Sequence, residues 1–167
     1  MAGSIETIKL LREKSGAGVM DCKQALDEAK GDTETALKIL HNKGISAASK
    51  KTSRAANEGL VESYVHNGGQ IGAIVEINCE TDFVARTPEF KTLAHDIAMQ
   101  VAAMAPVHID HTDVPENDDS IPDDSLLMHQ TFIRDPSKTM QDLLSEAIGK
   151  LGENIVIRRF TRFSLGD

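Results

Sequence analysis

The chain has 167 residues, of which 40% are hydrophobic and 26% charged, a composition that indicates a folded globular protein and excludes a disordered one. The formal net charge of -8 argues against sequence-independent binding of nucleic acid, because phosphate contacts need clustered Lys and Arg. There is no apolar signal core at the N-terminus and no apolar run of roughly 18 residues, so we expect a cytoplasmic protein with no membrane or direct nucleic-acid partner.

The first segment, residues 1–45, is predicted to form three short helices. Glycines end the first helix, and Asp21 with Gln24 forms a D-x-x-Q capping box that is typical of the start of the second. Asp32 is placed to cap the third helix, which we expect to end before Gly44. A module this small buries little apolar surface, so its stability is expected to depend on docking to something else.

Two kinds of segment follow, a linker and a hairpin. Residues 46–57 are polar, basic and rich in Ala and Ser, so they are predicted to be a linker, with a helical conformation left open. A β-hairpin is predicted over 59–78, because the "NGG" stretch supplies turn chemistry between two runs of alternating polarity.

A long helix is predicted over 87–104. Thr87 is a capping residue, Pro88 suits the first helical position and Glu89 places an acid in the first turn. Three further segments complete a core of residues 58–167: an acidic exposed loop, a helix and a strand, at 106–125, 138–151 and 154–163. The predicted fold class is therefore α+β, with a three-helix module followed by a core in which a three-stranded antiparallel sheet packs against helices.

One glycine-rich stretch invites a phosphate-binding interpretation that its context excludes. A phosphate-binding loop follows a strand, whereas "GAGVMDCK" follows a predicted helix and lacks the required third glycine or the G-K-[ST] ending. We interpret it as a tight turn between helices that exposes Val19 and Met20.

The stretch "HIDHTD" offers four candidate metal ligands: His108, Asp110, His111 and Asp113. Their spacing matches no usual zinc pattern and acidic neighbours suggest a solvated loop, so we expect no metal there. No nucleophile and base form an adjacent pair, and no catalytic residue is predicted. Cys22 lies in phase with a helix core face, while Cys79 follows a strand and is open to either a structural or a reactive role.

The stretch "NCETDFVAR" places Asp82 and Phe83 at the junction between a predicted strand and a predicted helix. An aromatic side chain there either folds onto its own hairpin or acts as an anchor that enters a partner's pocket. The sequence alone leaves these two interpretations balanced.

Three separated stretches of the chain resemble the elongation factor Ts family, the nucleotide-exchange factors of the GTPase elongation factor Tu. "LREKSGAGVMDCKQAL" is similar to the family's N-terminal signature, "NCETDFVAR" to its central one and "GENIVIRRF" to the end of its core domain. Their order and their spread from end to end make the resemblance specific.

The resemblance implies a UBA-like three-helix module and a single core subdomain, as in the short members, some of which pair as homodimers through their sheets. It implies that elongation factor Tu is bound in its GDP-bound and nucleotide-free states, with no cofactor, no metal and no covalent chemistry. The exchange wedge maps onto Thr81, Asp82, Phe83 and Val84, with Phe83 entering near the partner's Mg²⁺ and phosphate site. Positions of the N-terminal module that match partner contacts are Arg12, Val19 and Met20, and further core contacts fall on Ile71 and Gly72.

The chain departs from the family pattern in two places. Val19 stands where the family usually has Met, and residues 106–126 replace a longer helical insertion of the short members. Two other classes of function remain open from the residues alone. One is a binding module in which the first 45 residues suffice, and the other is an enzyme that uses Cys79 or the His/Asp stretch.

Overall fold

In the computed structural model, which describes residues 5–114 and 121–166, three helices come first: α1 (Ile5–Ser15), α2 (Val19–Glu28) and α3 (Thr33–Ser49). They enclose a small aliphatic core that consists of Leu11, Cys22, Ala25, Leu26, Ala29, Ala36 and Leu40. The predicted cap of the third helix is confirmed, because the Asp32 carboxylate accepts the backbone N–H of Thr35 at 2.6 Å.

The predicted capping box of the second helix is wrong. The helix α2 begins at Val19, two residues before Asp21, and its N-cap is Gly18, which makes no side-chain cap. Asp21 therefore lies inside the first turn, where its charge still favours the helix dipole but where the D-x-x-Q geometry does not apply.

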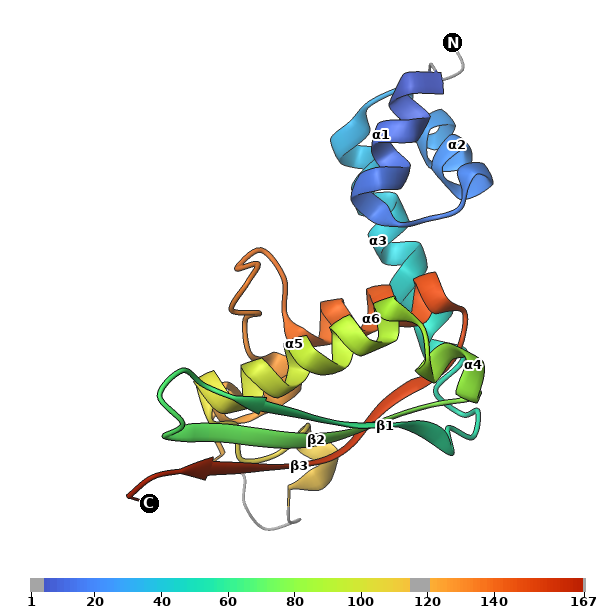
Figure 1. The fold of residues 1–167 in the computed structure, drawn as a ribbon. Helices are drawn as coiled ribbons and strands as arrows, with labels where there is room; N and C mark the ends of the chain where they lie inside the picture. Colours follow the sequence, from blue (N-terminus) through green and yellow to red (C-terminus); the bar gives the residue numbers. More distant parts are fainter. Residues whose placement is uncertain (1–4, 115–120, 167) are drawn as a thin grey trace.

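The predicted end of the third helix before Gly44 is also wrong, since α3 continues to Ser49. The reason is tertiary: α3 passes close to α6 (Met140–Leu151), and a Cβ placed on Gly149 would lie 3.7 Å from the Cα of Gly44. Packing of α3 against α6 favours the continued helix, and this outweighs the weak helix propensity of Gly44. Figure 1 shows α3 as the connection from the N-terminal helices to the rest of the chain.

The sheet has the predicted three antiparallel strands in the order β1-β2-β3. The predicted hairpin is formed by β1 (Glu58–Val65) and β2 (Ile71–Cys79), and β3 (Ile155–Ser164) pairs with the other edge of β2. The pairing of β2 with β3 shifts register between Glu76 and Ile77. The hairpin turn contains Gly68 and Gly69, both with positive φ, which explains why the "NGG" signal is reliable.

One face of the sheet is covered by α5 (Pro88–Met104), with α6 beside it (Figure 1). The predicted start of α5 is confirmed: Pro88 is in its first turn and the Thr87 hydroxyl accepts the backbone N–H of Phe90 at 3.2 Å. Phe90 itself is fully buried and joins the main core with Val75 and Ile77 of β2. Burial of this aliphatic face is the main stabilising contribution to the core.

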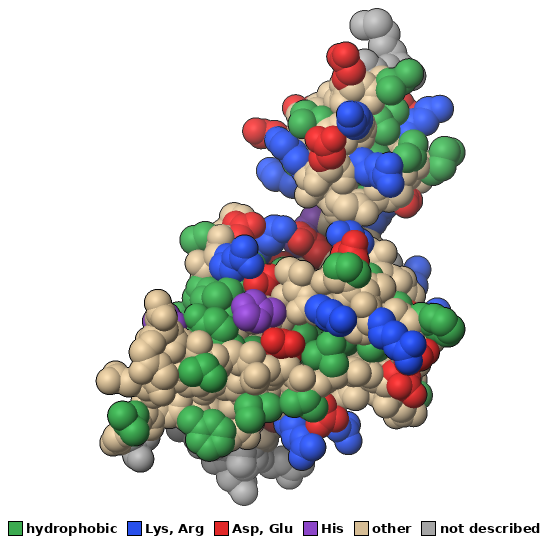
Figure 2. All heavy atoms as spheres, viewed as in Figure 1, with side chains coloured by type: hydrophobic (Ala, Val, Ile, Leu, Met, Phe, Trp, Pro, Cys, Tyr) green, Lys and Arg blue, Asp and Glu red, His purple; other side chains and the backbone are tan. Residues whose placement is uncertain are grey.

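The other face of the sheet carries exposed hydrophobic side chains from all three strands. These are Val61, Val65, Ile74 and Phe163. Figure 2 shows hydrophobic side chains gathered over the strands at the lower edge of the molecule. The four side chains come from three adjacent strands on one face, whereas exposed hydrophobic residues on soluble proteins are usually scattered singly.

The connection between α5 and α6, predicted as an acidic exposed loop over 106–125, contains short 3-10 helices in its described part. They are η1 (His111–Asp113), η2 (Asp123–Ser125) and η3 (Leu127–His129), and residues 115–120 of the predicted loop lie outside the described residues. Leu126, Leu127 and Met128 are buried and anchor the connection to the core. Among the helices in the described ranges, none combines the length and apolarity needed to cross a bilayer.

Candidate functional site

The residues of the TDFV stretch form the start of a separate short helix, α4 (Asp82–Ala85), between β2 and α5. Phe83 on this helix is 78% exposed, whereas Ala85 is buried against the core. The interpretation of Phe83 as a residue folded onto its own hairpin is therefore wrong. A large apolar side chain is thus held in solvent at the end of the sheet. Its exposure is unfavourable, and no packing within the chain compensates for it.

The start of α4 is fixed by one carboxylate from a distant part of the sequence. Glu153, in the turn between α6 and β3, accepts the backbone N–H groups of Glu80 and Thr81 at 3.1 and 3.0 Å. It also accepts the Thr81 hydroxyl at 2.6 Å. The Thr81 hydroxyl oxygen in turn accepts the N–H of Val84 at 3.4 Å and caps the helix.

A second set of contacts fastens the same junction to the segment before β1. The Glu80 carboxylate accepts the backbone N–H of Asn154 at 2.6 Å and pairs with Arg54 at 3.4 Å. The buried Asn154 side chain donates to the backbone carbonyls of Arg54 and Thr52 at 2.7 and 3.4 Å. Three turns that are far apart in the sequence are thus joined at the base of α4.

The far side of α4 is held by its connection to α5. Thr87 donates its hydroxyl to the Val84 carbonyl at 2.8 Å while it caps α5, and Asp82 pairs with Arg86 at 2.8 Å one turn along. The Asp82–Arg86 pair is exposed, so its contribution to stability is small, but it orients the Asp82 carboxylate beside Phe83. With the backbone of α4 fixed at both ends, Phe83 is presented in a pre-organised position.

Sequence reasoning missed Glu153, Glu80 and Asn154 as positioning residues. Their backbone partners lie 72 to 102 residues away along the chain, and no periodicity links such positions. The one local signal for such a role is the position of Glu153, an acid directly after Gly152, which ends α6 in the left-handed conformation.

We predict that Glu153→Ala lowers the free energy of unfolding by about 1–2 kcal/mol, because three hydrogen-bond donors at the start of α4 lose their acceptor. The loss is no larger because the site is partly exposed, so water replaces some of these hydrogen bonds. Urea denaturation followed by circular dichroism measures the change. Glu13→Ala, on the exposed face of α1, is the matched control and is expected to change stability by less than about 0.5 kcal/mol. Equal stability of the two variants would contradict the positioning role of Glu153.

The other predicted contact residues are separated from α4. Arg12, Val19 and Met20 lie at the surface of the N-terminal helices, with Val19 and Met20 exposed to 51% and 74%. Figure 1 shows these helices standing apart from α4. Ile71 and Gly72 are half-buried at the opposite end of β2 from α4. The structure therefore presents these residues as separate surfaces and not as one cluster.

Neither cysteine has the environment of a reactive thiol. Cys22 and Cys79 are both fully buried. Burial, reinforced by the negative charge of Glu153, raises the pKa of the Cys79 thiol, which donates to the carbonyl of Thr81 at 3.1 Å. A protonated, inaccessible thiol is a poor nucleophile. We therefore assign Cys79 a structural role, in which it packs in the core and donates to Thr81 at the start of α4.

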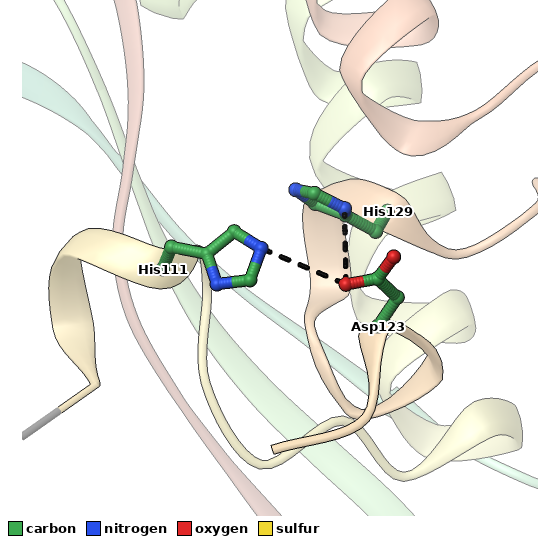
Figure 3. Close-up of side chains that lie close together, drawn as sticks. All are labelled: His111, Asp123 and His129. Carbon is green, nitrogen blue, oxygen red and sulfur yellow. Dashed lines mark ion pairs between the residues drawn. The ribbon is translucent and has the colours of Figure 1, made fainter. Parts of the chain in front are cut away.

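Within residues 5–114 and 121–166, the structure brings together one group of side chains that could ligate a metal ion. Of the four candidate ligands in "HIDHTD", only His111 belongs to this group. Its partners are Asp123 and His129, which no spacing in the sequence groups with it. Figure 3 shows the His111 and His129 rings, each with one nitrogen directed toward the same carboxylate oxygen of Asp123. Asp110 contacts the ring nitrogen of His129 that points away from Asp123. This cluster lies in the connection between α5 and α6 and is distinct from α4.

Comparison with known proteins gives one consistent result. The family model described as "Elongation factor TS" matches residues 33–121. A curated protein named elongation factor Ts from Caldanaerobacter subterraneus subsp. tengcongensis is 50% identical, with 98% of this chain and 97% of the relative covered. Proteins of the same name from Thermoanaerobacter sp. (strain X514) and Herpetosiphon aurantiacus are 48% and 44% identical, covering 98% and 100% of this chain and 95% and 100% of the relatives.

The lengths of these alignments bear on one departure noted in the sequence. They extend over 194 and 197 positions, although the chain has 167 residues, so the relatives contain residues that this chain lacks. That agrees with a shortened segment somewhere in the chain, as expected for residues 106–126.

Proposed function

Because the chain belongs to the elongation factor Ts family, we propose that it acts as a guanine-nucleotide exchange factor for elongation factor Tu. It works by binding the GTPase and not by covalent chemistry. The observation that carries the proposal is Phe83, an exposed aromatic residue on a helix that is locked to the core by Glu153.

The proposed mechanism is insertion of Phe83 near the Mg²⁺ and phosphate site of elongation factor Tu. Burial of this side chain in the partner is favourable by about 1.5–3 kcal/mol. Asp82 beside it directs the approach, and Thr81 and Val84 set the position of α4. If the insertion is possible only when the nucleotide site is open, the free energy of burial is available only to the nucleotide-free or loosened state.

The effect on nucleotide affinity follows from thermodynamic linkage. A protein that binds the nucleotide-free GTPase more tightly than the GDP-bound form weakens GDP affinity by the same factor. The burial of one Phe therefore corresponds to about a tenfold to hundredfold weakening, since 1.4 kcal/mol is a factor of ten. The nucleotide-free complex then persists until GTP binds and releases the factor.

We also propose that the N-terminal helices provide a second contact with elongation factor Tu through Arg12, Val19 and Met20. Exposed apolar side chains on a small module support this role, because they gain free energy only when a partner covers them. Ile71 and Gly72 provide a third contact from the core. Two separated contacts on one partner raise the overall affinity without strengthening either of them.

The proposal is tested by the affinity of the chain for elongation factor Tu with and without GDP. Isothermal calorimetry with the nucleotide-free GTPase is expected to give binding at least about tenfold tighter than with the GDP-bound GTPase. Equal affinity for both states would exclude an exchange function, even if binding were tight. Binding by residues 1–45 alone with the full affinity would favour the simple binding module.

The open face of the sheet supports one further proposal, a homodimer in which the sheets of two chains meet. Val61, Val65, Ile74 and Phe163 would be covered in such a dimer. Sedimentation velocity is expected to show a species of twice the mass of 18.1 kDa, and a single species of chain mass at high concentration would contradict it.

A further inference from the structure

The short helices between α5 and α6 bring two histidines and one aspartate together at the surface (Figure 3). The Nε2 atom of His111 lies 3.6 Å from Oδ1 of Asp123, and Nδ1 of His129 lies 3.9 Å from the same oxygen. We propose that His111, Asp123 and His129 form a binding site for a divalent transition-metal ion of the Zn²⁺ type. This site is separate from nucleotide exchange and does not depend on that function.

The spacing of the three ligand atoms fits one ion. Zn²⁺ lies about 2.0–2.2 Å from imidazole nitrogen and carboxylate oxygen, so two ligands of a tetrahedral ion are about 3.4 Å apart. The separations of 3.6 and 3.9 Å come within a few tenths of an ångström of that value, and all three ligand atoms lie within 4.8 Å of one another. Small side-chain rotations are enough to close the site around an ion.

The chemistry of the donor set selects the class of metal. Two imidazoles and one carboxylate suit Zn²⁺, Co²⁺ and Ni²⁺, whereas Ca²⁺ and Mg²⁺ prefer a set of oxygen ligands. Three protein ligands leave the fourth tetrahedral position to water, which the exposure of His111 and Asp123 allows.

A further carboxylate, Asp110, contacts the cluster and orients one of its proposed metal ligands. Asp110 Oδ1 lies 3.4 Å from Nε2 of His129, and the same oxygen accepts the backbone N–H of His111 at 2.7 Å. A carboxylate on one nitrogen of an imidazole fixes the ring and places the proton there, which leaves the other nitrogen free as a ligand. Asp110 is thus a positioning residue that holds His129 with Nδ1 directed toward Asp123.

The backbone that carries the ligands is itself anchored. The backbone carbonyl of His108 accepts the N–H of Leu127 at 2.9 Å, and the carbonyl of Ile109 accepts the N–H of Met128 at 3.0 Å. Leu127 and Met128 are buried in the main core, so the segment with His129 is held beside the segment with His111. An ion at the cluster would act as a clip between η1, η2 and η3 and would stabilise the connection from α5 to α6.

The site lies away from the exchange surface. The cluster follows the C-terminal end of α5, whereas α4 precedes its N-terminal end, and 17 helical residues extend over about 25 Å. Metal binding can therefore be tested on the chain alone, without elongation factor Tu.

The test is titration of the full chain, free of any polyhistidine tag and treated with a chelator, with Zn²⁺ in a calorimeter. We expect one Zn²⁺ per chain and a higher Tm when Zn²⁺ is present. His129→Ala and Asp123→Asn are expected to abolish both effects, while Asp110→Asn weakens binding by about 10–100-fold. The matched control is His66→Ala, an exposed histidine that contacts Tyr64 in the hairpin, and it is expected to bind Zn²⁺ as the wild type does.

Asp123 is mostly exposed, so Asp123→Asn is expected to fold normally, and far-UV circular dichroism verifies this for each variant. The proposal is overturned if the wild type binds no stoichiometric Zn²⁺. It is equally overturned if folded His129→Ala and Asp123→Asn variants bind Zn²⁺ with unchanged affinity.

Discussion

Phe83→Ala is expected to remove most of the acceleration of GDP release from elongation factor Tu, by about tenfold to hundredfold at equal concentrations of the factor. The reason is that the side chain gains its burial energy of about 1.5–3 kcal/mol only in the complex. Stopped-flow fluorescence with a labelled GDP measures the rate constant. Because Phe83 is mostly exposed in the free chain, its removal is expected to change the free energy of unfolding by less than about 0.5 kcal/mol.

Val107→Ala is the matched control for this variant. Val107 is also an exposed apolar residue, but it follows the C-terminal end of α5, at the opposite end of that helix from α4, and belongs to none of the proposed contacts. It is expected to leave the release rate within about twofold of the wild type. Equal rates for the Phe83→Ala variant and the wild type would mean that the exchange activity resides elsewhere in the interface.

Gly59→Ala is expected to destabilise the chain by at least about 2 kcal/mol. Gly59 on β1 has φ of 147°, and a Cβ at this position would overlap the carbonyl oxygen of Ile77 and lie 2.8 Å from the Cα of Asn78. Both neighbours are backbone atoms of the paired strand, so relief requires movement of β1 away from β2. Urea denaturation of the variant and the wild type measures the loss.

The same substitution at Gly44 provides a control with the opposite sign. Gly44 lies inside α3, and a Cβ there meets no heavy atom within 4 Å. Gly44→Ala is therefore expected to stabilise the chain by about 0.5–1 kcal/mol, because alanine loses less backbone entropy in a helix. A loss of stability at Gly44, or none at Gly59, would contradict the packing described for α3 and β1.

Local signals in the sequence were sufficient for most of the core. Thr87 and Pro88 start α5 where a cap followed by proline predicts it, and the glycines of the hairpin turn adopt the positive φ that the turn requires. These features act within a few residues, so no knowledge of the distant chain is needed to interpret them.

The errors at the helix ends have two different sources. Gly44 would end an isolated helix, but here α3 continues past it and packs against α6 near Gly149. The box predicted at Asp21 is wrong because the backbone becomes helical two residues earlier, at Val19. Tertiary packing decides where α3 ends, whereas the earlier start of α2 moves Asp21 out of the cap position.

The candidate site divides in the same way. The stretch containing Phe83 was visible as an aromatic at a junction, but its exposure depends on how α4 is held. That hold comes from Glu153 and Asn154, whose contacts with the junction join distant turns. The grouping of His111 with His129 was likewise hidden, because it depends on the folding of the connection between α5 and α6.

The rate constant of GDP release from a bacterial elongation factor Tu is the measurement that decides whether this chain is an exchange factor. Labelled GDP bound to the GTPase is chased with excess unlabelled GDP, with and without the wild-type chain. We expect release to become at least about tenfold faster, with a rate that rises with the concentration of the chain until it saturates. A release rate that stays the same at every concentration of the chain would exclude an exchange function.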